Sequence, residues 1–387
     1  MIPNELILYI TLRTKNENRK FSQSNHYMKT ISCLFLTASK PKAARHIYFD
    51  KLARSFADDN IKVVVIYDNN YTNSELNHPN LISKAWPSQR PTKLADFFFL
   101  IKLIKEHKPD AILSSFGSVN VCNIVGYFTK IRYRINFLLS TPLIFNDKGF
   151  TGLIKKMRKK SIYSLANLYL ANSFGVLNEL KDYYHISLYP HLILPNLIND
   201  DFIEQNKRKK QLVIVGGLNR LKGHEYLLNQ FRELLVKEPK LKLLIIGDGI
   251  EKIKLKTKYS DLIDSGNIEF TGKIERTKVL DHISESLVHV SSSLEEAFGF
   301  VNIESMMLST PIICTKTSGS KLILKENFNG EFFSLDENNS LSVSFFRITQ
   351  NWDKYSNNAR EDFLERFSLN KNIESHMNMI LKKFDGV

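Results

Sequence analysis

Short apolar runs alternate with longer segments of helical period along most of this 387-residue chain. The runs are rich in β-branched residues, as in "KVVVIY" at 62–67, and the segments between them repeat apolar residues every three or four positions. Strands joined by helices lie parallel in a sheet whose two faces the helices cover. The pattern therefore predicts an α/β protein. In the first half, we expect strands at residues 29–38, 61–68, 109–117, 133–140, 168–173 and 191–196.

The alternation pauses once, at the polar and charged stretch 199–211, and then resumes. Such a stretch is typical of an exposed connection between domains. The chain is also longer than one ordinary core, since domains hold roughly 150 residues. We therefore predict two Rossmann-like parallel-sheet domains that face each other across a cleft. The second has expected strands at 212–217, 241–249, 268–272, 288–293 and 310–314.

This organisation gives four predicted segments. Residues 1–28 form an N-terminal extension, and Met28 is a second candidate start because a strand opens directly after it. Residues 29–200 and 201–370 form the two domains. Residues 371–387 complete a pair of amphipathic C-terminal helices and are expected to pack back across the hinge.

The positive charge is concentrated in the first half. Of the net +14, residues 1–200 carry 27 Lys and Arg against 14 Asp and Glu, whereas residues 201–387 carry 27 against 26. This asymmetry indicates an anionic partner such as a membrane surface, a phosphorylated acceptor or nucleic acid. Nucleic acid is disfavoured, because the chain has no RNA-binding motif and no aromatic and basic alternation on a predicted sheet face.

One basic segment could meet that partner. In "TGLIKKMRKKSIYSL", residues 151–165, five cations interleave with apolar residues, which is typical of an amphipathic helix on an anionic lipid leaflet. The alternative is a solvated helix whose apolar side belongs to the core. The cations are Lys155, Lys156, Arg158, Lys159 and Lys160.

Cysteine and hydropathy exclude other classes. Cys33, Cys122 and Cys314 lie far apart without metal-ligand spacing, which favours reduced thiols in the cytosol. No apolar run approaches the roughly 20 residues that span a bilayer.

The stretch "EEAFGFVNIE", residues 295–304, predicts a binding site. A helix that begins near Phe300 or Val301 would present the backbone N–H groups of residues 298–301 to an anion, and Gly299 would let a phosphate come close. Glu304, inside that helix, could hold a ribose diol, and Glu296 could reach hydroxyl groups of an attached sugar. Two carboxylates at this spacing are, on spacing alone, more often ordinary surface residues.

Three other strand ends support this interpretation. Gly216 and Gly217 follow a strand and precede Arg220 and Lys222, which suit a diphosphate. A basic strand-to-helix turn without a ligand explains this motif equally well when it is taken alone. Gly247 and the pair Thr271 and Gly272 end two further strands at the same predicted sheet edge.

These motifs resemble a known family. "GGLNRLKG", "IGDG", "FTG", "EAFGFVNIE" and "STPIICTKTSG" stand in the order of the motifs of the retaining GT-B glycosyltransferases of family 4. The first half is similar more loosely, through "KPDAIL", "LANS" and "ILPNLIN". The resemblance covers about residues 29–385. It implies a GT-B fold with an acceptor-binding first domain and a nucleotide-sugar-binding second domain.

The resemblance also implies roles for the residues. Glu304 would hold the ribose, Glu296 the donor sugar and Lys222 the diphosphate, with the backbone of Phe298 and Gly299 beside sugar and diphosphate. The family's diphosphate arginine is replaced here by Gly217, and we hypothesise that Arg220 substitutes for it. The acid of a later family turn is likewise replaced, by Leu322.

The acceptor side of the site is less defined by sequence. The family's frequent histidine after the fourth predicted strand is absent, and Ser140 and Thr141 stand near that point. His46 is a possible acceptor contact, although a partly exposed surface histidine is the more usual interpretation. No Asp-x-Asp occurs, so we expect no metal and no cofactor.

The sequence thus predicts a metal-independent, retaining hexosyltransferase at the cytoplasmic membrane. Its substrates would be a nucleoside-diphosphate sugar, with UDP favoured, and a glycan or lipid-linked acceptor in surface polysaccharide or lipopolysaccharide synthesis. We expect it to be cytoplasmic and peripheral to the inner face of that membrane. One alternative is a sugar-nucleotide epimerase on the same fold, and another is a non-catalytic protein that binds anionic surfaces or nucleic acid.

Overall fold

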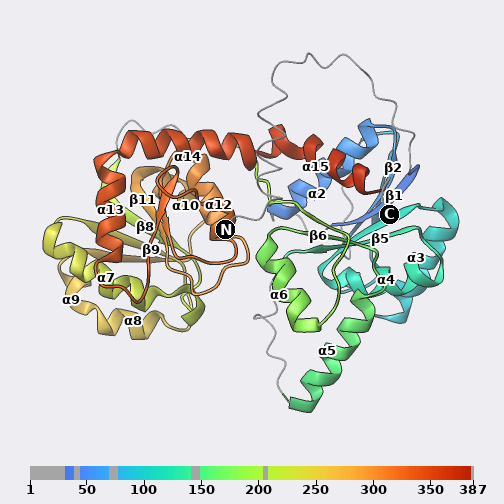
Figure 1. Ribbon diagram of the computed structural model, residues 1–387, viewed down its shortest axis with the longest axis horizontal. Helices are drawn as coiled ribbons and strands as arrows, with labels where there is room; N and C mark the ends of the chain where they lie inside the picture. The colour runs from blue at the N-terminus through green and yellow to red at the C-terminus, as the bar shows by residue number, and fades with distance from the viewer. Residues whose placement is uncertain (1–30, 39–43, 69–76, 141–148, 204–207, 385–387) are drawn as a thin grey trace. The chain divides into compact units, whose positions relative to one another are not determined.

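The computed structural model describes residues 31–38, 44–68, 77–140, 149–203 and 208–384 (Figure 1). These residues form two parallel-sheet α/β domains, as predicted. The expected extension 1–28 and the candidate start Met28 lie outside the described residues.

The first domain is built on a parallel sheet in which seven strands are described. Their order is β3-β2-β1-β4-β5-β6-β7, and every neighbouring pair is parallel. The apolar runs become the central strands because both faces are buried, as in β2, where residues 63–67 have no exposed surface. The strands are β1 (Cys33–Thr37), β2 (Lys62–Tyr67), β3 (Leu81–Ala85), β4 (Ala111–Ser115), β5 (Tyr133–Leu138), β6 (Leu168–Ala171) and β7 (His191–Ile193).

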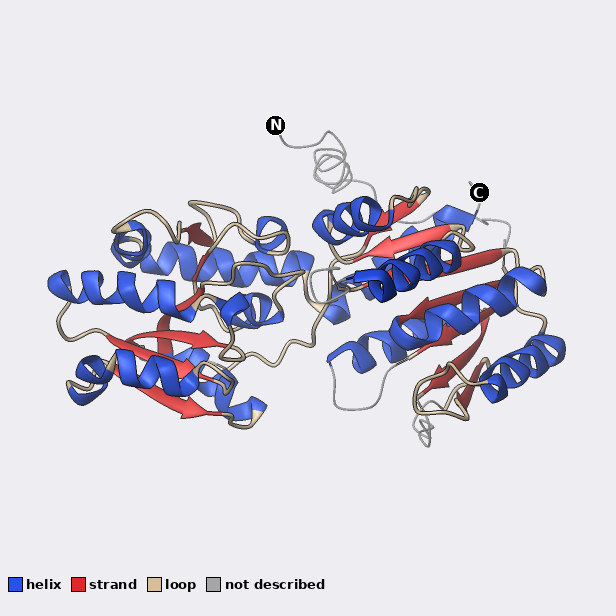
Figure 2. Ribbon diagram, turned by 90° about the horizontal axis from the view of Figure 1, so that it is seen from below, coloured by secondary structure: helices blue, strands red, loops and turns tan. Residues whose placement is uncertain are grey.

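Helices cover both faces of this sheet (Figure 2). One face packs in a hydrophobic cluster with α2, and the other in clusters that include α3, α4 and α6. The helices are α2 (Ala44–Asp58), α3 (Leu94–His107), α4 (Val119–Phe128), α5 (Gly149–Tyr163) and α6 (Phe174–Tyr184), with a short 3-10 turn η1 (Phe116–Ser118).

A helix from the far end of the sequence completes the first domain. The helix α15 (Leu369–Phe384) lies beside α2 (Figure 1), and its apolar residues belong to the same cluster as strands β1 and β2. The centroids of the Phe384 and Tyr133 rings lie 4.5 Å apart, with the rings tilted by 40°, and the Tyr133 hydroxyl donates to the Phe384 carbonyl. The packing of α15 therefore joins sequence positions more than 200 residues apart.

The second domain has a parallel sheet of six described strands in the order β10-β9-β8-β11-β12-β13. They are β8 (Lys209–Val215), β9 (Lys242–Ile246), β10 (Ile268–Gly272), β11 (Ser286–Ser291), β12 (Ile312–Cys314) and β13 (Gly330–Phe332). The connecting elements are η3 (Arg220–Lys222), α7 (His224–Lys237), α8 (Lys252–Lys258), α9 (Ser260–Asp264), α10 (Arg276–Glu285), α11 (Phe300–Met307), α12 (Ser320–Ile323), α13 (Ser340–Gln350) and α14 (Trp352–Arg366).

The order of the second sheet reverses at β8 and β11. The helix α7, which follows β8, packs in the cluster on one face, and α11, which follows β11, packs on the other. Helices that leave neighbouring strands toward opposite faces open a crevice between them at the carboxyl ends of those strands. The fold therefore sets a candidate ligand site between β8 and β11.

Candidate functional site

A pocket of about 310 Å³ lies at the carboxyl ends of β8 and β11. Its walls come from the strand ends, the η3 turn with the start of α7, and the first turn of α11. The lining residues are Ile214, Val215, Gly216, Gly217, Lys222, His224, His289, Ser291, Ser292, Ser293, Glu296, Gly299, Phe300, Val301 and Asn302. The structure thus brings together the two glycines, the lysine and the Phe-Gly turn that the sequence singled out.

The Phe-Gly turn leads directly into a helix. Gly299 has φ +96°, and a Cβ at this position would lie 2.8 Å from Nδ2 of Asn302, so a side chain would be both strained and crowded. The helix α11 begins at the next residue, Phe300. The first N–H groups of a helix have no partner inside it and lie at the positive end of its dipole. This end of the pocket can therefore hold an anion.

Lys222 reaches the pocket from a clamped turn. The Ser292 hydroxyl donates to the Lys222 carbonyl over 2.8 Å, and the Leu294 amide donates to the Leu221 carbonyl over 2.8 Å. Gly223 follows with φ +64°, and a Cβ there would lie 2.0 Å from the Ser292 carbonyl oxygen. Only glycine allows the turn to press this closely against the end of β11.

The Lys222 ammonium forms an ion pair with the Glu296 carboxylate. Both side chains are partly exposed, at 30% and 23%, and both line the pocket. The pair places a cation and a carboxylate together in the lining of the pocket. The positive charge of Lys222 would attract a polyanion that enters the pocket.

Glu304 lies in the second turn of α11, outside the lining of the pocket. Its side chain is 13% exposed, and the Arg276 guanidinium contacts its Oε1 at 3.0 Å. Arg276 also contacts Asp201 at 3.0 Å. Burial raises the pKa of the Glu304 carboxyl above its ordinary value, and Arg276 opposes that rise. The sequence did not indicate Arg276, because no motif couples it to a residue 28 positions away.

The other predicted donor residues do not line this pocket. Arg220 is exposed at the start of η3 and does not line the pocket. Gly247 and Gly272 pair their backbones at the ends of β9 and β10, where the Gly247 amide donates to the Gly272 carbonyl over 2.9 Å. The Thr271 hydroxyl donates to the Gly272 carbonyl over 2.9 Å. Phe298 is buried in the core, so only its backbone could contact a ligand.

Three buried polar side chains in the pocket wall were not predicted from the sequence. His224, His289 and Asn302 are each 2% exposed or less, and both ring nitrogens of each histidine have no hydrogen-bond partner among the described residues. Burial, with the charge of Lys222 as a smaller cause, lowers the pKa of His224 to about 4 and that of His289 to about 3. Both rings are therefore neutral at neutral pH.

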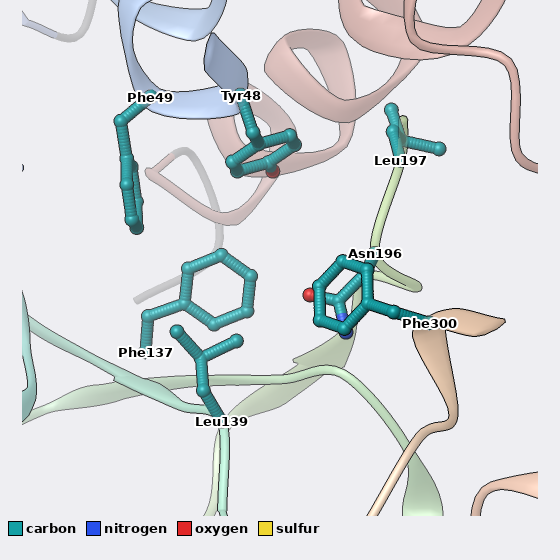
Figure 3. A pocket seen from close by; sticks show the side chains of 7 residues that line it. All are labelled: Tyr48, Phe49, Phe137, Leu139, Asn196, Leu197 and Phe300. Carbon is teal, nitrogen blue, oxygen red and sulfur yellow. The ribbon is translucent and has the colours of Figure 1, made fainter. Parts of the chain in front are cut away.

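Phe300 lines a second, much smaller cavity of about 10 Å³ (Figure 3). Figure 3 shows its ring among side chains of the first domain, with Tyr48, Phe49 and Phe137 on the opposite wall. A cavity of this size holds about one water molecule, which excludes a sugar or nucleotide. The part of Phe300 that could serve a ligand is thus its backbone at the start of α11.

In the first domain, His46 is buried rather than partly exposed, so the interpretation as a surface histidine was wrong. Its Nε2 lies 3.0 Å from Oδ2 of Asp50, and the Tyr67 hydroxyl donates to Oδ1 of the same carboxylate over 2.6 Å. His46 and Asp50 are in contact because residues four apart lie on the same face of a helix. Ser140 is half-buried after β5, and Thr141 lies outside the described residues.

The basic helix α5 presents apolar side chains to solvent. Leu153, Ile154 and Met157 are 52%, 52% and 61% exposed, so this stretch of α5 does not bury its apolar residues in the core. Lys155, Arg158 and Lys160 are exposed, whereas Lys156 and Lys159 are half-buried. The alternative that the apolar side of this helix belongs to the core is therefore wrong for its first turns.

Within the described ranges of the chain, no three His, Cys, Asp or Glu side chains come close enough to hold a metal ion together. No helix in the same ranges has the length and apolar composition to cross a membrane.

A protein family matches the second domain of this chain. The family described as Glycosyl transferases group 1 matches residues 198–366, which contain the whole second sheet and the pocket. The match agrees with the family resemblance of the sequence motifs.

Curated relatives are similar over part of their length. The chain is 26% identical over 250 residues to an uncharacterized glycosyltransferase of Methanocaldococcus jannaschii, covering 59% of this chain and 61% of the relative. It is 27% identical over 226 residues, or 55% and 59% of the two chains, to a Campylobacter jejuni enzyme. That enzyme is N-acetylgalactosamine-N,N'-diacetylbacillosaminyl-diphospho-undecaprenol 4-alpha-N-acetylgalactosaminyltransferase. The chain thus spans about 60% of the length of these two relatives.

Solved structures match over nearly the whole chain. HepE of Anabaena in complex with UDP and glucose aligns with a TM-score of 0.65 at 16% identity, covering 91% of this chain and 99% of HepE. The lipopolysaccharide outer core galactosyltransferase WaaB aligns with a TM-score of 0.67 at 16% identity and the same coverage. The chain therefore has the fold of the GT-B glycosyltransferases. Within that class, the second domain of this chain matches the family described as Glycosyl transferases group 1.

Proposed function

We propose that this protein is a retaining glycosyltransferase of family 4 that moves a hexose or N-acetylhexosamine from a nucleoside-diphosphate sugar to a glycan or lipid-linked acceptor. The observation that carries the proposal is the pocket between β8 and β11, where Lys222, Glu296 and the Gly299 turn meet. The family match over this domain supports it. UDP is the favoured nucleotide, since HepE binds it on the same fold.

On donor binding, the Lys222 ammonium would exchange the Glu296 carboxylate for the diphosphate of the donor. A diphosphate offers more charge and more acceptor oxygens than one carboxylate, so it would compete with Glu296 for the ammonium group. The N-terminus of α11 would hold the same diphosphate through backbone N–H groups around Gly299. Glu296, released from the lysine, could then accept hydrogen bonds from hydroxyl groups of the donor sugar.

The transfer step would rely on charge stabilisation and positioning. The bond between the anomeric carbon and the phosphate oxygen breaks, and the acceptor oxygen bonds to that carbon on the same face. The acceptor proton passes to the departing phosphate oxygen. Lys222 and the positive end of α11 would stabilise the charge that develops there. We propose that no metal is needed, and activity that is equal in EDTA and in Mg²⁺ would support this.

Glu304 would bind the ribose through the carboxylate oxygen that Arg276 does not engage. Arg276 contacts Oε1, which leaves Oε2 as a candidate acceptor. We keep Arg220 as the candidate substitute for the missing diphosphate arginine, since it begins the turn that contains Lys222.

The test is calorimetric titration of the full chain with UDP, GDP, ADP and CMP, repeated on Lys222→Ala and Glu304→Ala. Lys240→Ala and Glu269→Ala, both at exposed positions of the second domain, are matched controls. Selective binding of one nucleotide, weakened only in the first two variants, is the expected result. Absence of binding to all four would refute the donor site. Product analysis without acceptor would distinguish an epimerase, which would still convert the sugar nucleotide.

The acceptor side of the proposal concerns a membrane. We propose that α5 attaches the protein peripherally to the inner face of the cytoplasmic membrane, where lipid-linked glycans are assembled. Exposed Leu153, Ile154 and Met157 would enter the lipid interface while the neighbouring lysines and Arg158 meet anionic head groups. The C. jejuni relative, whose name includes a diphospho-undecaprenol, is consistent with such an acceptor.

Liposome flotation tests this attachment. Each basic residue near an anionic surface contributes about 1 kcal/mol, so Lys155→Glu with Arg158→Glu should weaken binding at least thirtyfold. The control is Lys237→Glu with Lys240→Glu, which makes the same charge change on exposed lysines of the second domain. Equal flotation with neutral and anionic vesicles would contradict the proposal. Salt-sensitive binding to random nucleic acid would instead favour a nucleic-acid partner.

A further inference from the structure

The wall of the pocket contains polar groups that the fold itself does not satisfy. His289 comes from the buried middle of β11 and His224 from the first position of α7, and each is 1% exposed. Neither ring has a hydrogen-bond partner for either nitrogen among the described residues, yet both residues line the pocket. A buried polar group without a partner destabilises a fold, so such groups are rare unless a ligand or water completes them.

The two histidines share their surroundings with Lys222. Lys222, His224 and His289 all line the one pocket. The lysine charge is the smaller cause, after burial, of the lowered pKa of both rings. Neutral imidazole carries one N–H donor and one acceptor nitrogen. The pocket therefore combines one cation with two uncharged donors.

The chemistry of these groups matches one part of the proposed donor. A diphosphate has only acceptor oxygens, and it needs several donors once it leaves water. Lys222 and the start of α11 supply some of them, but Gly217 stands where the resembling family has an arginine. Arg220, the proposed substitute, is exposed and does not line the pocket, so further donors would be needed inside the pocket itself.

We propose that the neutral rings of His224 and His289 each donate a hydrogen bond to the diphosphate of the bound nucleotide sugar. The two rings would thus supply donors that the missing arginine does not. This inference rests on the proposed donor site and adds two binding residues to it. Both histidines stand at positions where the sequence alone indicates residues of the core. Asn302, whose Oδ1 is also unpartnered, borders the same space from α11.

The experiment measures affinity for UDP and for uridine, which lacks phosphates, by calorimetry on the full chain. The variants are His289→Leu, His289→Gln and His224→Leu, with His282→Leu as the control because His282 is half-exposed on α10 outside the pocket. Loss of a hydrogen bond to a charged phosphate should weaken UDP binding about tenfold or more in each Leu variant. Uridine binding should not change, and Gln, which keeps a neutral N–H donor, should restore part of the loss.

The outcomes separate this inference from the proposed function. If the unmodified chain binds UDP and both Leu variants bind it equally well, the histidines are structural and the inference is refuted while the donor site stands. If UDP and uridine affinities fall together, the change has disturbed the pocket and the inference is also refuted. If the unmodified chain binds no nucleotide, both proposals fail. Should His289→Leu not fold, His224→Leu at the start of α7 decides the question.

Discussion

Replacing Gly223 with alanine should destabilise the second domain and disrupt its site at once. A left-handed residue costs alanine about 1 to 2 kcal/mol. The added Cβ would also lie 2.0 Å from the Ser292 carbonyl oxygen, so the η3 turn must move away from β11. That movement breaks two clamping hydrogen bonds, each worth about 1 kcal/mol net. We expect Gly223→Ala to lower the free energy of unfolding by about 3 to 4 kcal/mol.

The chain offers a matched control in Gly266. This glycine is also left-handed, at φ +76°, but a Cβ there would meet no atom within 4 Å. Gly266→Ala should therefore cost only the backbone strain, about 1 to 2 kcal/mol. Comparing the two variants separates the strain of the conformation from the crowding at β11.

The assay is urea unfolding followed by fluorescence in a Trp86→Phe background. Trp352 then reports on the second domain, since its indole N–H donates to the Leu287 carbonyl of β11 over 2.8 Å. UDP titration of the same variants measures whether Lys222 has moved. If Gly223→Ala is no less stable than Gly266→Ala and binds UDP with unchanged affinity, the clamp does not position the lysine.

Three further predictions follow from the packing of charged and buried groups. Arg276→Ala removes the cation that opposes the raised pKa of the Glu304 carboxyl. In the role proposed for Glu304 at the ribose, the carboxylate is a stronger acceptor than the protonated acid. As the pH is lowered, UDP affinity should therefore begin to fall at a higher pH in the variant than in the unmodified chain, and titrations between pH 5 and 8 test this. Gly217→Arg should be tolerated, because a Cβ there meets nothing closer than 3.4 Å, and should tighten UDP binding about tenfold by adding a charged hydrogen bond; unchanged or weaker binding contradicts it. Burial lowers the pKa of His376 to about 3, so the first domain should have its full stability above about pH 6.5 and lose up to about 1.4 kcal/mol per pH unit below it. His376→Gln should flatten that profile in urea unfolding followed by Trp86, and an unchanged slope would refute the assignment.

The central strands could be predicted from the sequence because they are buried on both faces. Residues such as those of β2 and β9 form uninterrupted apolar runs because helices cover both sides of them. The edge strands β3 and β13 were not predicted. Each has one neighbouring strand, and sequences such as "LISKA" and "GEF" lack the apolar run that marks a central strand.

Sequence spacing predicted which motifs would meet, because the carboxyl ends of neighbouring parallel strands share one edge. Lys222, Glu296 and Gly299 do line one pocket, and their roles in binding stay predictions. His289 could not be found in this way, since a histidine inside an apolar strand is usually part of the core. Arg276 was missed because its contact with Glu304 depends on how α10 and α11 pack.

The burial of individual side chains on helices also could not be predicted from the sequence. His46 looked like a surface residue at the start of a helix, but its contacts with Asp50 and the Tyr67 ring enclose it. The first turns of α5 were open to two interpretations for the same reason. Helical periodicity identifies an apolar side, whereas the tertiary structure decides whether anything covers it.

The position of α15 has a consequence for synthesis on the ribosome. Its residues Ile373, Met377 and Ile380 belong to the hydrophobic cluster of the first domain, but they are translated after the whole second domain. Domains of a nascent chain usually fold in order of their emergence. Here the second domain can finish folding while the first still exposes the apolar surface on α2 that α15 will cover. The first domain to appear is thus the last to be completed, and a chaperone would have its longest opportunity to bind at that surface.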